Sequence, residues 1–134
     1  MNHDNLHLGI SLHAKNSGHE TALVYEDVSF TFQEFNNRVN TLGNSLQAKG
    51  IKKGDHVILY MRNRMEMVEI FYAISAIGAV AVPINYMVRG QDLIQLINSS
   101  DAVFAFVEIQ KFPDYKEGLS NYAKIQPSNT AIVG

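Results

Sequence analysis

Three short apolar runs separated by helical patterns constrain the fold of this chain most strongly. The runs cover residues 56–61, 79–83 and 102–107, and the helical patterns cover residues 67–77 and 92–99. The first run, HVILYM, is apolar on both faces, which is typical of a strand inside a parallel sheet. Strands that alternate with helices favour right-handed crossovers. The sequence therefore predicts an α/β fold in three layers, with a mostly parallel sheet flanked by helices.

The best-marked single element is a helix that begins after Thr31. Thr31 and Glu34 have the spacing of a capping box, and Gly50 supplies a left-handed residue at the other end. Gly43, in the middle, indicates a close approach to a neighbour. Apolar residues recur at steps of three and four and predict a face that packs on the sheet: Phe32, Phe35, Val39, Leu42 and Leu46. On this basis, Leu42→Ala is expected to cost about 2–5 kcal/mol.

Weaker patterns predict the remaining elements. They are a short helix, two strands of a hairpin, a looser helix and a final strand, at residues 6–15, 21–25, 28–31, 111–125 and 130–133. Glu26 and Asp27 form the expected hairpin turn.

Size and charge exclude several classes of protein. The 134 residues suit one small domain, and the net charge of -2 without a basic block argues against a nucleic-acid partner. No apolar run approaches the ~20 residues of a transmembrane helix. The amino-terminal residues do not resemble a signal peptide, and there is no cysteine. We therefore expect a cytoplasmic protein.

Several residues that could carry chemistry have a simpler structural interpretation. His3, His7 and His13 lack the carboxylates or cysteines that would complete a metal site. His19 and His56 have no evident acid or nucleophile partner. The segment 50–55, GIKKGD, has an Asp where a phosphate loop needs Lys, so a turn is favoured.

Two further groups could contribute to a ligand site. Four methionines, Met61, Met65, Met67 and Met87, could line an acyl pocket, although methionine is more often a core filler. Asn85 and Tyr86 directly follow a predicted strand, and ligands of open α/β sheets gather beyond the carboxyl ends of strands. A structural loop is still the interpretation that we favour for this pair.

Several segments together resemble the opening of the adenylate-forming, or AMP-binding, enzymes. They are TFQEFNNRVN at 31–40, GIKKGDHV at 50–57, NRME at 63–66, FYAI at 71–74 and GAVAVPIN at 78–85. Within this family, which includes acyl-CoA synthetases, luciferases and peptide-synthetase adenylation domains, the chain is most similar to fatty-acid and acyl-CoA ligases. Asn85 supports that choice, because adenylation domains usually have Asp there.

The resemblance implies what the parent enzyme does. It would activate a carboxylic acid with ATP to an acyl-adenylate and pass the acyl group to coenzyme A, with magnesium as a cofactor. Residues 127–133 resemble the strand that leads into the family's phosphate loop, T-S-G-T-T-G-x-P-K. That loop and the family's other catalytic motifs would follow Gly134.

We therefore expect residues 1–134 to form a single α/β domain, the amino-terminal fragment of the large domain, ending just before the phosphate loop. The chain alone is expected to be inactive and to hold no cofactor, so no catalytic, cofactor-binding or metal residue is assigned. Its expected partners are the remainder of the ligase and a second copy of itself. The alternatives are a stand-alone binding or scaffolding module and a flavodoxin-like domain with an accidental resemblance.

Overall fold

The computed structural model describes residues 21–25, 28–62, 65–119, 125 and 129–133. The helix expected at 6–15, the turn at 26–27, and His3, His7, His13 and His19 lie outside these residues. The chain forms two compact units: Met1–Lys53 with Arg64–Ala79, and Gly54–Asn63 with Val80–Gly134.

The described part of the first unit contains the predicted hairpin and two helices. Strands β1 (Thr21–Tyr25) and β2 (Val28–Thr31) pair antiparallel, and helix α2 (Phe32–Ala48) follows directly. The capping box is present: the Thr31 N–H donates to Glu34 Oε1 at 3.0 Å, and the Glu34 N–H donates to Thr31 Oγ1 at 3.1 Å. The hydrogen bond from the Thr31 backbone N–H to the Glu34 carboxylate, with a smaller contribution from the Thr31 side chain, lowers the pKa of Glu34.

The carboxyl end of α2 is closed by Gly50 in a left-handed conformation, as predicted. Its φ is 93°, and its N–H donates to the Gln47 carbonyl at 2.9 Å. The Ile51 N–H reaches the Leu46 carbonyl at 3.2 Å, which completes a Schellman motif. The segment 50–55 is therefore a helix end and a turn, as its sequence indicates.

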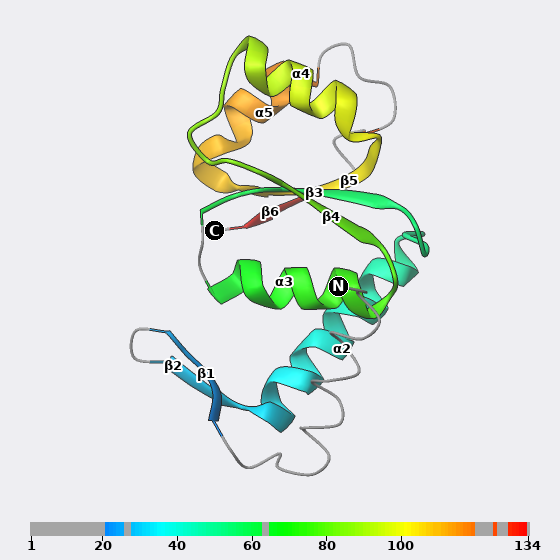
Figure 1. Ribbon diagram of the computed structural model, residues 1–134, viewed down its shortest axis with the longest axis vertical. Coiled ribbons are helices and arrows are strands. Elements are labelled where there is room, and N and C mark those ends of the chain that lie inside the picture. The colour runs from blue at the N-terminus through cyan, green and yellow to red at the C-terminus, as the bar shows by residue number, and fades with distance from the viewer. Residues whose placement is uncertain (1–20, 26–27, 63–64, 120–124, 126–128, 134) are drawn as a thin grey trace. The chain divides into compact units, whose positions relative to one another are not determined.

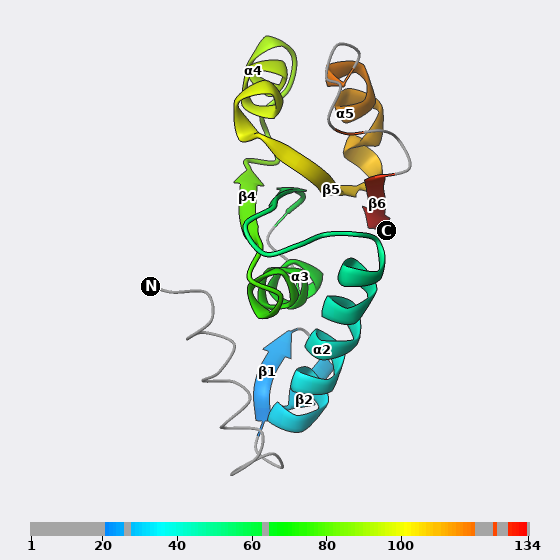
Figure 2. The same cartoon turned by 90° about the vertical axis from the view of Figure 1, so that its right-hand side faces the viewer.

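Helix α2 packs against helix α3 (Met65–Ala76), which it crosses, within this unit (Figure 2). A Cβ placed on Gly43 would lie 3.4 Å from Ile77 Cγ2, so Gly43 does permit a close approach. The rings of Phe35 and Tyr72 meet edge to face, with centroids 5.4 Å apart. The contacts shown for this helix face are thus made with α3.

The buried face of α2 differs in one respect from the predicted one. Its buried residues are Phe35, Val39, Gly43 and Leu46, whereas Leu42 is only half-buried. Because the two helices approach at Gly43, the buried stripe is centred there, and Leu42 lies at its margin. The cost expected for Leu42→Ala was therefore too high.

The second unit contains a four-stranded sheet in which every pair is parallel, with the order β4-β3-β5-β6. Its strands are β3 (His56–Tyr60), β4 (Val80–Ile84), β5 (Ala102–Glu108) and β6 (Thr130–Val133). Helices α4 (Gln91–Ser100) and α5 (Phe112–Gly118) lie together on one side of the sheet (Figure 1). The α/β fold class predicted from the apolar runs is confirmed.

An apolar cluster holds this sheet to helices α4 and α5. It contains Ile58 and Tyr60 from β3, Leu93 and Ile97 from α4, and Tyr115 from α5, all buried. Neighbouring side chains of β3, Val57 and Leu59, are buried as well, so both faces of the strand are covered. Because both faces are buried, polar and apolar residues do not alternate along the β3 sequence.

The segment after β5 is more divided than the sequence predicts. A 3₁₀ turn, η1 (Ile109–Lys111), precedes α5, which ends at Gly118 rather than continuing to Ile125. Residues 120–124 of the predicted helix are not described. Across the described ranges, no helix is both long enough and apolar enough to cross a bilayer.

Candidate functional site

Polar and aromatic side chains gather where the parallel strands of the second unit end. Tyr60 is in register with Ile84 on one side and with Val107 on the other, so β3, β4 and β5 end at one edge. The residues that follow these ends include Arg62, Asn85, Tyr86, Gln110 and Lys111. We refer to this edge, where an open α/β sheet binds its ligands, as the carboxyl edge.

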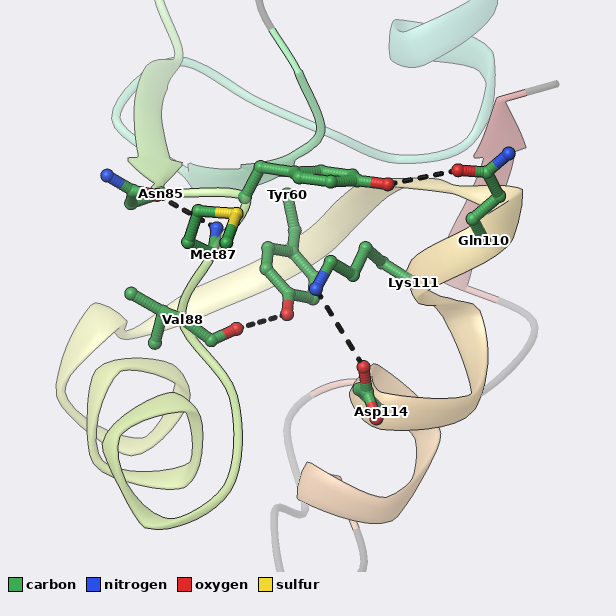
Figure 3. A network of polar contacts seen from close by, with 8 residues as sticks. Tyr60, Asn85, Met87, Val88, Gln110, Lys111 and Asp114 are labelled. Atoms are coloured by element: carbon green, nitrogen blue, oxygen red, sulfur yellow. Dashed lines mark hydrogen bonds and ion pairs between the residues drawn. The ribbon is translucent and has the colours of Figure 1, made fainter.

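The turn after β4 is fixed by its own hydrogen bonds (Figure 3). Asn85 Oδ1 accepts the Met87 N–H at 2.8 Å, and the Asn85 carbonyl accepts the Val88 N–H at 3.0 Å. The Tyr60 hydroxyl donates to the Val88 carbonyl, which ties the turn to the end of β3. Met87 is left 72% exposed at the tip, so it is not the core filler that methionine usually is.

Tyr86 connects the ends of β4 and β5. Its hydroxyl donates to Gln110 Oε1 at 3.0 Å. Lys111 Nζ lies 4.7 Å from the centroid of its ring, and Arg62 Cζ lies 5.3 Å from it. Both distances are within the range of cation–π attraction. Tyr86 is therefore a side chain contacted by two cations, and not merely part of a loop.

Lys111 is largely buried between aromatic rings and a carboxylate. Its ammonium lies 5.9 Å from the centroid of the Tyr60 ring and 4.0 Å from Asp114 Oδ2 (Figure 3). Burial raises the pKa of the Tyr60 phenol, and the negative charge of Asp114 adds to this effect, while Arg89 opposes it. The phenol consequently remains protonated at neutral pH and can donate its hydrogen bond to Val88.

A buried ion pair joins the ends of β3 and β5. Glu108 is only 1% exposed, and its Oε2 lies 3.0 Å from Arg62 Nε. Its other oxygen accepts the Arg62 backbone N–H at 3.3 Å. A carboxylate at this depth needs such compensation, because an isolated buried charge is very costly. The pair fixes the backbone that leaves β3.

The structure also decides between interpretations of single residues. His56 Nδ1 lies 2.7 Å from the Ser100 carbonyl oxygen, which can only accept, so this nitrogen carries the proton and holds β3 to the end of α4. Met61 is buried, and only Met87 of the methionines named above is strongly exposed. Within the described ranges, no three His, Asp or Glu side chains converge as a metal site would require.

Sequence reasoning found only part of this cluster. Asn85 and Tyr86 were recognised from their place after a strand, but Arg62, Glu108 and Lys111 were missed. The expectation that ligands gather beyond the carboxyl ends of strands, applied to the ends of the first and third apolar runs, would have pointed to these residues. The cluster brings together two cations, Arg62 and Lys111, each paired with a carboxylate, and two tyrosine hydroxyl groups that donate hydrogen bonds.

The sequence also matches known proteins. The family profile of AMP-binding enzymes matches residues 10–133. A curated relative, crotonobetaine/carnitine–CoA ligase of Salmonella enteritidis, is 30% identical over 105 residues, which are 75% of this chain and 20% of the relative. The chain thus spans about a fifth of the length of that relative.

Solved structures agree with the sequence match. A long-chain-fatty-acid–CoA ligase from Archaeoglobus fulgidus superimposes with a TM-score of 0.84 at 25% identity, over 96% of this chain and 27% of that one. The inhibitor-bound N-terminal domain of FACL13 from Mycobacterium tuberculosis gives a TM-score of 0.83 at 26% identity, over 96% and 33% of the two chains.

Proposed function

The chain belongs to the AMP-binding enzyme family as part of an adenylate-forming acyl-CoA ligase, and we propose that the whole protein activates a carboxylic acid with ATP. The acid would become an acyl-adenylate with release of pyrophosphate, and the acyl group would then pass to coenzyme A. The family match over residues 10–133 carries this proposal. It agrees with the family expected from the sequence.

The position of β6 supports a further part of the proposal. Val133 is in register with Glu108, so β6 ends at the carboxyl edge beside the cluster described above. A phosphate loop that followed β6 would begin at this edge, where parallel sheets bind their ligands. We therefore propose that residues 1–134 form the first part of the large domain and precede that loop.

ATP, magnesium and coenzyme A belong to the proposed reaction rather than to the described residues. Magnesium would neutralise charge that develops on the phosphates, and the phosphate loop would supply backbone N–H groups. No residue described above is assigned to the metal. A cytoplasmic location is also part of the proposal.

Pyrophosphate exchange tests this function. The protein expressed from the complete coding sequence, supplied with ATP, magnesium and a panel of carboxylic acids, should exchange labelled pyrophosphate into ATP with at least one acid. The 134-residue chain is the matched control. It should give no exchange above buffer, because it contains no phosphate loop and no counterpart of the family's catalytic Lys.

Two outcomes would contradict the proposal. Exchange catalysed by the 134-residue chain would mean that the chemistry is carried by residues described above. A folded, complete protein that gives no exchange with any acid would instead favour a binding or scaffolding module.

A further inference from the structure

The ion pair between Arg62 and Glu108 holds only one end of the arginine side chain. Glu108 Oε2 lies 3.0 Å from Nε as an ion pair without hydrogen-bond geometry, and Glu108 Oε1 accepts the Arg62 backbone N–H at 3.3 Å. Four of the five guanidinium N–H donors belong to the two terminal amino groups, which lie beyond Nε. The pair therefore orients the guanidinium, and most of its N–H donors lie on the terminal amino groups, farther from Glu108 than Nε is.

The outer part of Arg62 reaches solvent. Its side chain is 54% exposed although its partner Glu108 is almost fully buried. The guanidinium carbon lies 5.3 Å from the centroid of the Tyr86 ring, and the ring itself is held by the hydrogen bond to Gln110. An arginine that is ion-paired on one side and flanked by a ring on the other loses less freedom when it binds a further group, which favours recognition of an anion.

The end of β6 lies on the far side of β5 from this arginine, because the strand order is β4-β3-β5-β6. Glu108 and Val133 are partners in neighbouring parallel strands, which run about 4.8 Å apart. Arg62 follows β3 and contacts Glu108 on β5, so a phosphate loop that followed β6 would meet the guanidinium by extending across the end of β5. Arginine binds phosphate oxygens in a planar, bidentate geometry.

We propose that Arg62 contacts a phosphate group of the nucleotide in the complete protein, with Glu108 as the residue that positions it. This inference rests on the proposed function, because the nucleotide is the substrate of that reaction. Nε remains on Glu108, and the terminal amino groups donate to a phosphate oxygen. Glu108 thereby has a second role besides joining two strands.

A charge-neutral double variant separates this role from a structural one. Arg62→Gln alone would leave the buried Glu108 without compensation and is expected to destabilise the fold. The double variant Arg62→Gln/Glu108→Gln has no buried charge, so its thermal unfolding should lie close to that of the parent. Lys116→Gln, an exposed position on α5, is the control for the loss of one positive charge.

The variants are compared by pyrophosphate exchange in the complete protein. For the double variant we expect the KM for ATP to rise about 10- to 100-fold, the range of one hydrogen bond to a charged group. The KM for the acid should stay unchanged in the double variant. In Lys116→Gln, the KM for ATP and the KM for the acid should both stay unchanged. Arg62→Lys keeps the charge that compensates Glu108 but not the planar fork, so it should stay folded and still raise the KM for ATP.

An unchanged KM for ATP in the folded double variant would overturn the proposal and leave Arg62 with a purely structural role. If the double variant did not fold, an unchanged KM in Arg62→Lys would have the same consequence. Failure of the proposed function is distinguishable, since the unsubstituted protein itself would then give no exchange.

Discussion

Replacing Leu46 by Ala is expected to destabilise the protein by about 2–5 kcal/mol, the range for removal of a fully buried leucine side chain. Leu46 is 1% exposed and belongs to the buried stripe of α2. Its carbonyl also accepts the 6→1 hydrogen bond of the Schellman motif, where a hydrophobic pair commonly accompanies the backbone hydrogen bonds. Its counterpart Ile51 is buried too. Since a small domain has only ~5–15 kcal/mol of stability in total, Leu46→Ala would leave a large unfolded fraction.

Leu42→Ala is the matched control for this prediction. It makes the same chemical change four residues earlier in the same helix, at a half-buried position. We expect it to cost roughly 1 kcal/mol, in proportion to the smaller apolar area that it exposes. Urea denaturation of both variants gives the comparison. Equal losses of stability at the two positions would contradict the burial described for α2.

The isolated chain is expected to self-associate through β6. Among the described strands, β6 lies at the sheet edge with β5 as its neighbour, and Ile132 on it is 51% exposed. Edge strands with apolar side chains pair with other chains, commonly about a two-fold axis. The net charge of -2 provides little repulsion against this. Light scattering at micromolar concentration should therefore give a mass above that of the monomer.

A lysine on the edge should prevent this association. Ile132→Lys places a charge on the exposed edge, a device by which natural edge strands avoid pairing, and is expected to restore the monomer. Leu96→Lys makes the same kind of change on α4, away from the edge, and should leave association intact. A strictly monomeric mass for the unsubstituted chain, independent of concentration, would refute the exposed edge.

The parts of the fold with strong periodicity were predictable from sequence. The runs at β3 and β5 are apolar because these strands are buried nearly throughout, whereas β4 at the sheet edge is only partly buried. Helix α2 has a capping box at one end and Gly50 at the other. The edge of the buried face of α2 was less predictable. Leu42 fits the helical repeat as well as Leu46 does, and only the close approach at Gly43 decides which of them is buried.

The site was harder to predict because its residues come from separate strand ends. Glu108 follows an apolar run, and nothing in the local sequence indicates that this carboxylate is buried against Arg62. Lys111 was assigned to a long helix, whereas it ends a 3₁₀ turn and reaches Tyr86. Register between parallel strands brings these side chains together, and a single sequence specifies that register only weakly.

The nucleotide sequence directly downstream of the Gly134 codon tests the central claim most directly. If the chain is the opening part of an adenylate-forming ligase, the reading frame should continue into a Ser/Thr/Gly-rich phosphate loop of the form T-S-G-T-T-G-x-P-K. That loop would start at the carboxyl edge, where β6 ends in register with Glu108. A natural stop codon directly after Gly134, with no such loop in frame, would contradict the account and favour a stand-alone module.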